Sequence, residues 1–104
     1  MLVCQWHLDV PFGKRGAALA IMKAWGQDKF AYSEFRKAKG GRVLVGEVGL
    51  SPTHIVDEYL FESLADFEAA LAGMGDERFR RHAEALAPYI VPGSQHWTVL
   101  KIVE

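Results

Sequence analysis

The chain has 104 residues, 50% of them hydrophobic, and a formal net charge of −1. A chain of this length and composition forms one globular domain over residues 1–104 and is not disordered. No apolar run approaches the ~20 residues that span a bilayer, so no membrane partner is expected. The single cysteine, Cys4, excludes an internal disulfide and is typical of a reducing compartment, which predicts a cytoplasmic location.

The first element is a strand, because apolar and polar residues alternate from Leu2 to Asp9. Pro11 and Gly13 follow and end it. The start of the chain has no basic region and its apolar run is interrupted, so we expect no signal peptide.

A helix is predicted from about Lys14, where apolar residues recur at helical spacing. If it ran unbroken to Lys39 it would exceed ~35 Å, which is longer than a small sheet can cover. We therefore expect a break near Gly26, with Asp28 capping a second segment. The first segment buries Ala18, Ile21, Met22 and Trp25, and the second carries Phe30, Tyr32 and Phe35.

Two strands follow, Arg42 to Leu50 and His54 to Glu62, joined by a turn at Ser51-Pro52. The hydrophobic period then changes from two to between three and four. Ser63 stands at this change and, with Asp66, predicts a helix start of the capping-box type.

The last third of the chain is predicted to hold two helical segments and a strand. The first segment has a buried stripe and is interrupted at Gly73 and Gly75, the second spans about Asp76 to Ala87, and the strand spans Gln95 to Val103. The order β-α-β-β-α-β predicts an α+β, ferredoxin-like fold: a four-stranded antiparallel sheet with helices on one face. The buried stripe predicted for the first of these two helical segments consists of Leu64, Phe67, Ala70 and Leu71.

Both alternating sets of residues in each strand contain apolar side chains. The third strand, for example, has Ile55 and Phe61 in one set and Val56 and Leu60 in the other. A monomer rarely leaves such an apolar sheet face in water. The pattern therefore predicts a homodimer whose two sheets meet face to face.

The segment Tyr59 to Asp66, YLFESLAD, resembles the dimeric α+β barrel superfamily, in which a strand ends in an aromatic residue and a serine that opens a helix. The likeness extends through Phe79 to His82 and Tyr89 to Ser94, and it includes antibiotic-biosynthesis monooxygenases, EthD-like proteins and NIPSNAP-like proteins. The resemblance implies a homodimer with a ligand pocket between sheet and helices. Haem-degrading members also have a histidine near the end of the second helix, which makes a haem-handling role for His82 an alternative.

The candidate catalytic residues are His7, His54, Asp57 and Tyr59, because the first and third strands are expected to be parallel neighbours. A buried carboxylate beside an imidazole tunes it for proton transfer. We expect His7 or His54 to move a proton, Asp57 to orient the imidazole, and Tyr59 to donate a hydrogen bond to developing negative charge. Asp57 and Glu58 should face opposite sides of the sheet. The other interpretation of these groups is a structural pair that satisfies buried polar atoms.

Aromatic residues are expected to wall the pocket, as a small organic ligand requires. The sequence therefore favours a cofactor-independent enzyme acting on an aromatic or polyketide-like molecule, of monooxygenase, isomerase or cyclase type. A non-catalytic ligand-binding or assembly module is the alternative. No metal-ligand spacing, phosphate loop or aromatic–basic interleaving is present, so no metal, cofactor or nucleic acid is predicted. The candidate substrate-binding residues are Trp6, Trp25, Tyr32, Phe61, His82 and Trp97.

Overall fold

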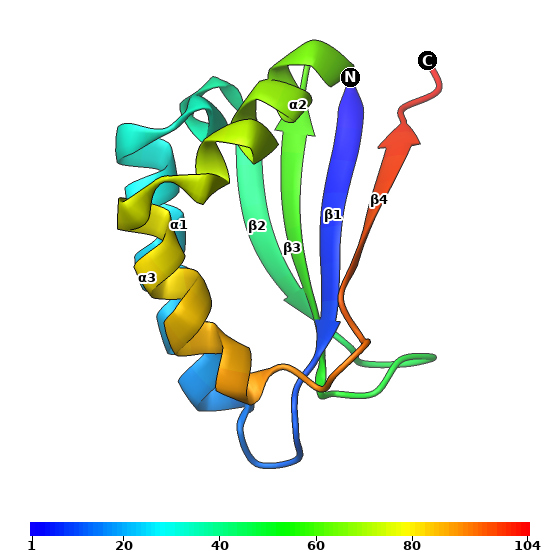
Figure 1. Cartoon of the computed structure of the whole chain (residues 1–104). Helices are drawn as coiled ribbons and strands as arrows, with labels where there is room; N and C mark the ends of the chain where they lie inside the picture. The colour runs from blue at the N-terminus through cyan, green and yellow to red at the C-terminus, as the bar shows by residue number, and fades with distance from the viewer.

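The computed structural model describes residues 1–104 and contains four strands and three α-helices (Figure 1). Short 3-10 turns follow each helix, at 34–37, 73–75 and 87–89. No helix combines the length and apolar character needed to cross a membrane. The elements are β1 (Leu2–Asp9), α1 (Arg15–Tyr32), β2 (Gly40–Val45), β3 (His54–Phe61), α2 (Leu64–Ala72), α3 (Glu77–Leu86) and β4 (His96–Lys101).

The strands form one sheet in the order β2-β3-β1-β4, and every neighbouring pair is antiparallel (Figure 1). The predicted ferredoxin-like fold is confirmed, but the expectation that the first and third strands run parallel is wrong. The crossover through α1 makes β2 run in the direction of β1. The chain then reverses after β2, so β3 runs against β1.

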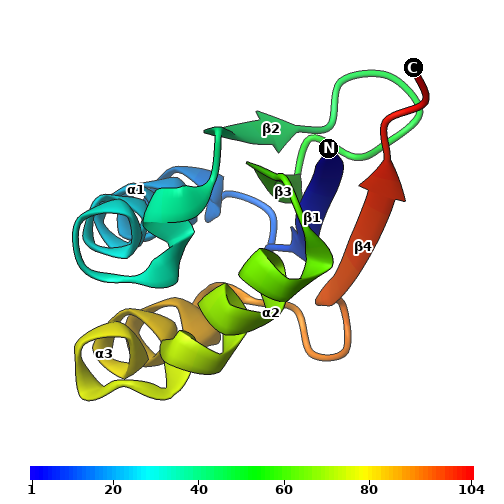
Figure 2. The same cartoon turned by 90° about the horizontal axis from the view of Figure 1, so that it is seen from above.

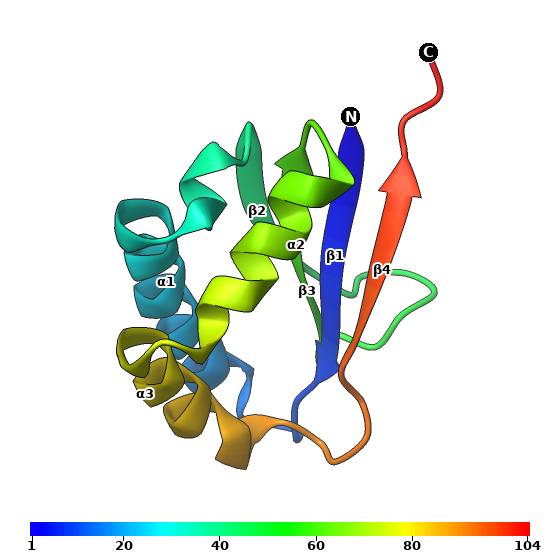
Figure 3. The ribbon, with the colours of Figure 1, turned by 45° about the horizontal axis from the view of Figure 1, so that its top comes forward.

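All three helices lie on one face of the sheet, and the loop between β2 and β3 projects on the other side (Figure 2). We call these the helix face and the open face. Residues Cys4, Trp6 and Leu8 of β1 are buried on the helix face, and their alternation explains why they share one face. Helices α1 and α3 pack side by side, and α2 runs obliquely across the same face of the sheet (Figure 3).

Helix α1 runs through Gly26 without a break, so the predicted break and the Asp28 cap are wrong. A glycine inside a helix costs about 1 kcal/mol relative to alanine. Burial of a continuous stripe on both sides of Gly26 outweighs this cost. The helix instead ends at Tyr32 and is capped by Ser33. The Ser33 hydroxyl donates to the Lys29 carbonyl and accepts from the Phe35 N–H. The buried stripe of α1 consists of Ala18, Met22, Trp25 and Lys29.

The predicted start of α2 is confirmed, since the Ser63 hydroxyl accepts a hydrogen bond from the Asp66 N–H at 3.2 Å. Strand β2 differs from its prediction: it begins at Gly40 and ends at Val45 instead of Leu50. The chain turns at Gly46, where a Cβ atom would lie 2.0 Å from the Ser51 carbonyl oxygen. Only glycine fits this turn, which closes the loop 46–53.

Candidate functional site

The four predicted catalytic residues are divided between the two faces of the sheet. In the register of β1 and β3, His7 stands opposite Val56, and Asp57 stands opposite Trp6. His7 and His54 therefore lie on the open face, whereas Asp57 and Tyr59 lie on the helix face. The expected pairing of His7 with Asp57 is wrong, because the register pairs odd-numbered residues of β1 with even-numbered residues of β3, and directly opposed residues share a face.

Asp57 and Tyr59 form a buried cluster with Lys29 of α1. The Lys29 ammonium lies 3.3 Å from Asp57 Oδ2 and 3.1 Å from the Tyr59 hydroxyl, and that hydroxyl donates to the same Oδ2 at 2.8 Å. The three residues are only 2–7% exposed. Aromatic rings enclose the ammonium, with the Trp25 ring 4.3 Å and the Phe35 ring 5.1 Å from Nζ.

Burial shifts the pKa values of Lys29 and Tyr59 in this cluster. It lowers the pKa of the Lys29 ammonium, and the charge and hydrogen bond of Asp57 oppose that change. Burial and then the adjacent carboxylate raise the pKa of the Tyr59 hydroxyl, so Tyr59 remains a hydrogen-bond donor. The cluster thus holds a cation, a carboxylate and a neutral donor within an apolar enclosure.

A cavity of about 120 Å3 between α1 and the β2–β3 pair reaches this cluster. Both contacts to the Asp57 carboxylate are made to Oδ2, which leaves Oδ1 for another partner. The indole N–H of Trp25 is buried without a hydrogen-bond acceptor, and Trp25 does not line this cavity. The cavity is lined by Met22, Lys23, Gly26, Phe30, Gly41, Arg42, Val43, Asp57 and Tyr59.

Most of the predicted substrate-binding residues fill the core instead of walling a large pocket. Trp6 packs edge-to-face on Trp25 and stacks on Trp97, and Phe61 is fully buried. Tyr32 is 59% exposed and lies under the Arg78 guanidinium. The expected pocket walled by these aromatic residues is therefore absent from the space between sheet and helices, where a cavity of about 120 Å3 lies.

His82 lies between α3 and α1 and does not face a pocket. Its Nε2 atom is 2.6 Å from Asp28 Oδ2, and its ring stacks on Trp25. A haem ligand needs a free imidazole nitrogen aimed at the iron, and Nε2 is engaged. The geometry gives no support to a haem-handling role.

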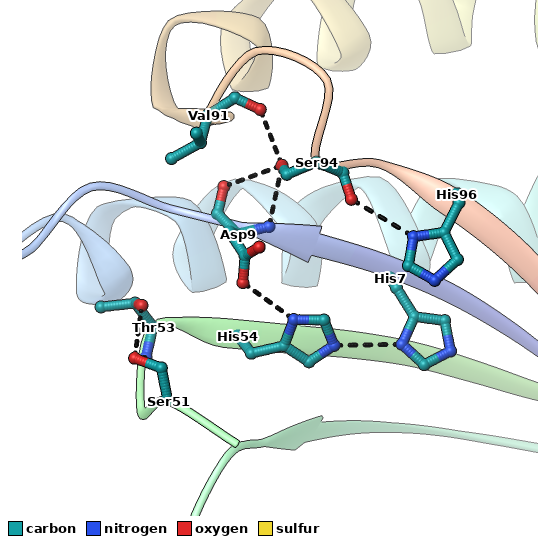
Figure 4. Close-up of polar contacts among 8 residues, drawn as sticks. All are labelled: His7, Asp9, Ser51, Thr53, His54, Val91, Ser94 and His96. Atoms are coloured by element: carbon teal, nitrogen blue, oxygen red, sulfur yellow. Dashed lines mark hydrogen bonds and ion pairs between the residues drawn. The ribbon is translucent and has the colours of Figure 1, made fainter.

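On the open face, hydrogen bonds connect side chains of three strands. His54 Nδ1 lies 2.8 Å from Asp9 Oδ1, His54 Nε2 lies 3.1 Å from His7 Nδ1, and His7 Nε2 lies 3.0 Å from the Thr98 hydroxyl. We call these four residues the histidine relay; Figure 4 shows its Asp9–His54–His7 part. The Ser94 hydroxyl accepts from the Asp9 N–H and so fixes the end of the relay.

The relay favours a neutral His7. Burial first, and then the neighbouring His96 and His54, lower the pKa of His7. His96 stacks on His7 with ring centroids 4.6 Å apart. When each of His7 and His54 bears one proton and Asp9 is ionised, His54 donates to Asp9 and His7 donates to His54. The Thr98 hydroxyl lies within reach of two acceptors, His7 Nε2 at 3.0 Å and Gln5 Oε1 at 3.3 Å.

Sequence reasoning missed Lys29, Asp9 and Thr98. Lys29 follows Trp25 by four residues on the buried stripe of α1, which could have identified it as buried. Asp9 and Thr98 become visible only with the strand register, because Asp9 stands opposite His54, and Thr98 lies on the strand beside His7.

Comparison with known proteins gives the fold. No family model matches the chain, and no curated protein is detectably similar in sequence. Among solved structures, protein Atu4242 from Agrobacterium tumefaciens is 18% identical with a TM-score of 0.78, covering 99% of this chain and 94% of its own. A NIPSNAP domain protein from Burkholderia xenovorans is 17% identical with a TM-score of 0.77, covering 99% and 95%. SnoaB, a cofactor-independent oxygenase from Streptomyces nogalater, is 14% identical with a TM-score of 0.72, covering 99% and 93%.

Proposed function

We propose that this protein is a small enzyme that needs no cofactor and moves a proton on an aromatic or polyketide-like molecule. Its structural neighbours are NIPSNAP and antibiotic-biosynthesis monooxygenase-like proteins, the groups that the sequence resembles. The observation that supports this most is the Lys29–Asp57–Tyr59 cluster at the end of a cavity. A base, a cation and a neutral donor in a water-poor enclosure are the groups that deprotonate a weakly acidic substrate and hold its anion.

In the proposed reaction, Asp57 Oδ1 accepts a proton from an acidic carbon or hydroxyl of the substrate. The Lys29 ammonium then stabilises the enolate or phenolate, and the Tyr59 hydroxyl donates a hydrogen bond to it. An isomerisation returns the proton to another carbon. An oxygenation instead lets O2 add to the anion's carbon; the hydroperoxide loses water, so that a CH2 group and O2 become a C=O group and water.

The cavity sets a limit on what reaches the cluster. A cavity of about 150 Å3 binds benzene. At about 120 Å3, this one admits the reacting edge of a ring, while the rest of the substrate extends outward. Phe30 and Val43 line the cavity and are partly exposed, so they offer an apolar support.

The energetic cost of the cluster supports a functional role. Replacing a buried ion pair by apolar residues is often neutral or stabilising by about 1–4 kcal/mol. Stability alone therefore gives little reason for an ion pair at Lys29 and Asp57. Such groups are typical of sites where charge is needed for chemistry.

A non-catalytic binding or assembly module is the second candidate, and one observation favours it. The three tryptophans pack against neighbouring rings in the core, so little open volume remains on the helix face. In that case the cluster only joins α1 to the sheet.

We also propose the homodimer that the sequence predicts. The end of the open face near the chain termini is apolar, and Leu100 and Ile102 there are 54% and 40% exposed. Val3 and Leu60 lie beside them. Sedimentation at micromolar concentration should give twice the protomer mass, and a stable protomer would contradict the proposal.

The test of the function uses proton exchange and O2 uptake with a panel of anthrones and hydroxynaphthalenes. Asp57→Asn should abolish both, and Tyr59→Phe should lower them about 100- to 1,000-fold, because it removes one anion-stabilising hydrogen bond. The exposed Glu68→Gln is the matched control and should be unchanged. Circular dichroism must show that each variant is folded.

Full activity in a folded Asp57→Asn protein would overturn the proposed chemistry. Binding of the panel without turnover or exchange in the wild-type protein would establish the binding module instead.

A further inference from the structure

The cavity of about 120 Å3 on the helix face has one more positive charge than its own groups neutralise. Of the charged residues that line it, Asp57 is bound to Lys29, and Arg42 is bound to Glu58 on the open face. The third, Lys23 of α1, is exposed and forms no ion pair. A ligand in this cavity therefore meets one ammonium that the protein leaves without a carboxylate.

The surface of α1 is open between this ammonium and the buried cluster. Lys23 and Lys29 are six residues apart, so their Cα atoms are separated by ~9 Å along the helix axis. Gly26 lies between them and lines the cavity. A Cβ atom added there meets nothing within 4 Å. A ligand that reaches Asp57 can therefore extend along α1 to Lys23 without meeting a side chain at position 26.

Nothing in the fold itself requires a glycine at position 26. The helix is continuous through it, its φ angle is not positive, and no neighbouring atom is too close for a side chain. Glycine is also a poorer helix former than alanine. The missing side chain is explained when a ligand occupies the space beside Gly26.

The rest of the path suits an aromatic body. Met22, Phe30 and Val43 line the cavity, and Phe30 is 40% exposed. The Phe30 ring already lies 5.9 Å from the Tyr59 ring, within the range at which aromatic rings attract one another. The proposed homodimer covers the open face, whereas this cavity lies on the helix face, so a second copy does not occupy it.

We propose that the substrate is an aromatic carboxylic acid, whose reacting edge enters the cavity at Asp57 and whose carboxylate, at the far end of the rings, pairs with Lys23. This inference rests on the proposed function, because it names the substrate class of the same site. Lys29 then stabilises the anion that the reaction forms, and Lys23 binds the charge that the substrate carries throughout. Lys23 is a binding residue, since it does not reach the reacting atoms.

The test is isothermal titration of the full chain with three related probes: 6-hydroxy-2-naphthoate, 3-hydroxy-2-naphthoate and 6-hydroxy-2-naphthamide. The first carries its carboxylate across the rings from the hydroxyl, the second carries it beside the hydroxyl, and the third is uncharged. We expect the first to bind about fivefold more tightly than the others, the effect of one exposed ion pair. High salt should remove the difference, because it screens exposed charges.

Two variants separate the charge from the open surface. Lys23→Met should reduce the affinity for 6-hydroxy-2-naphthoate to that for the amide. Lys14→Met is the matched control, since this exposed lysine precedes α1, makes no capping hydrogen bond and does not line the cavity. It should bind all probes like the wild type. Gly26→Leu should abolish binding of both 6-substituted probes, because its side chain fills the space, while circular dichroism shows an intact helix content.

Equal affinity for the three probes would overturn this inference, as would an unchanged naphthoate affinity in Lys23→Met. Tight binding in Gly26→Leu would show that the ligand does not follow α1 and would overturn it too. In each case proton exchange or O2 uptake in the wild-type protein would still support the proposed reaction. Lys23-dependent binding with neither exchange nor uptake would instead overturn the reaction and support the acid-binding site. Absence of binding by all three probes would overturn both.

Discussion

Asp57 and Glu58 are consecutive residues of β3, yet their carboxylates lie on opposite faces of the sheet. Asp57 pairs with Lys29 beneath the helices, whereas Glu58 accepts hydrogen bonds from Gln5 and Arg42 on the open face. The prediction that these two acids face opposite sides is confirmed. Each face thus has its own polar network, with different partners and different solvent access.

Lys29→Met should lower the free energy of unfolding by about 3–5 kcal/mol, because it leaves the Asp57 carboxylate buried without its cation. The double variant Lys29→Met, Asp57→Leu should recover most of the loss. Urea unfolding of the three proteins measures both effects. The exposed pair of Glu77 and Arg80 provides the comparison, and Arg80→Met should change stability only slightly. A double variant as unstable as the single one would contradict a charge-based explanation.

Stability should decrease as the pH falls below neutrality, in part through His7. Its pKa is lowered on folding, so the unfolded chain binds the proton more tightly than the folded one. The loss begins near the ordinary value of 6.5 and is complete below the folded pKa. Thermal unfolding across this range should show a smaller pH dependence in His7→Gln than in the wild type. An identical dependence in both proteins would assign the effect to other groups.

Cys4 should resist thiol reagents in the folded protein. Its side chain is fully buried, and burial raises the pKa of the thiol, so the reactive thiolate is scarce. A disulfide reagent that releases a coloured thiol should react only at the rate of unfolding. The same protein in denaturant, where the thiol is free, provides the control. Rapid reaction without denaturant would mean that the end of the sheet near Leu2 opens readily.

Gly26→Ala should stabilise the protein by about 0.5–1 kcal/mol, since α1 is continuous there and alanine is the better helix former. A Cβ atom at this position meets nothing within 4 Å. Chemical denaturation would detect the gain. A loss of stability would instead indicate the helix break that the sequence suggested.

Gly46→Ala should disrupt the loop 46–53, because its Cβ atom would lie 2.0 Å from the Ser51 carbonyl oxygen. We expect a stability loss of about 1–3 kcal/mol, as for other strained backbone positions. Gly16→Ala, at a helical position with nothing within 4 Å, is the control and should not lose stability. NMR signals of residues 46–53 should change in the first variant alone.

The sequence predicted β1 to the residue, because strict alternation is followed at once by Pro11 and Gly13. It failed at Gly26 and in β2 for opposite reasons. At Gly26 the tertiary burial of Trp25 and Lys29 outweighed the local propensity. In β2 the chain turned earlier than its apolar residues indicated, because Gly46 permits a close backbone approach.

The site was predicted in part. Alternation shows which residues of one strand share a face, but it does not give the direction or register of the neighbouring strand. His7 was therefore paired with Asp57, although the carboxylate that reaches the imidazoles is Asp9. The contribution of Lys29 depends on how a helix packs on the sheet, which local periodicity does not contain.

Strand β1 belongs to both networks, with Trp6 beside the buried ammonium and His7, the next residue, in the relay. Their Cα atoms are ~3.8 Å apart along the chain, so neither side can shift its backbone without shifting the other. A ligand that moves β1 on one side should thus alter affinity on the other, and thermodynamic reciprocity requires the converse to hold equally. Through this one strand, the small fold has a direct route for communication between two chemically unlike polar networks.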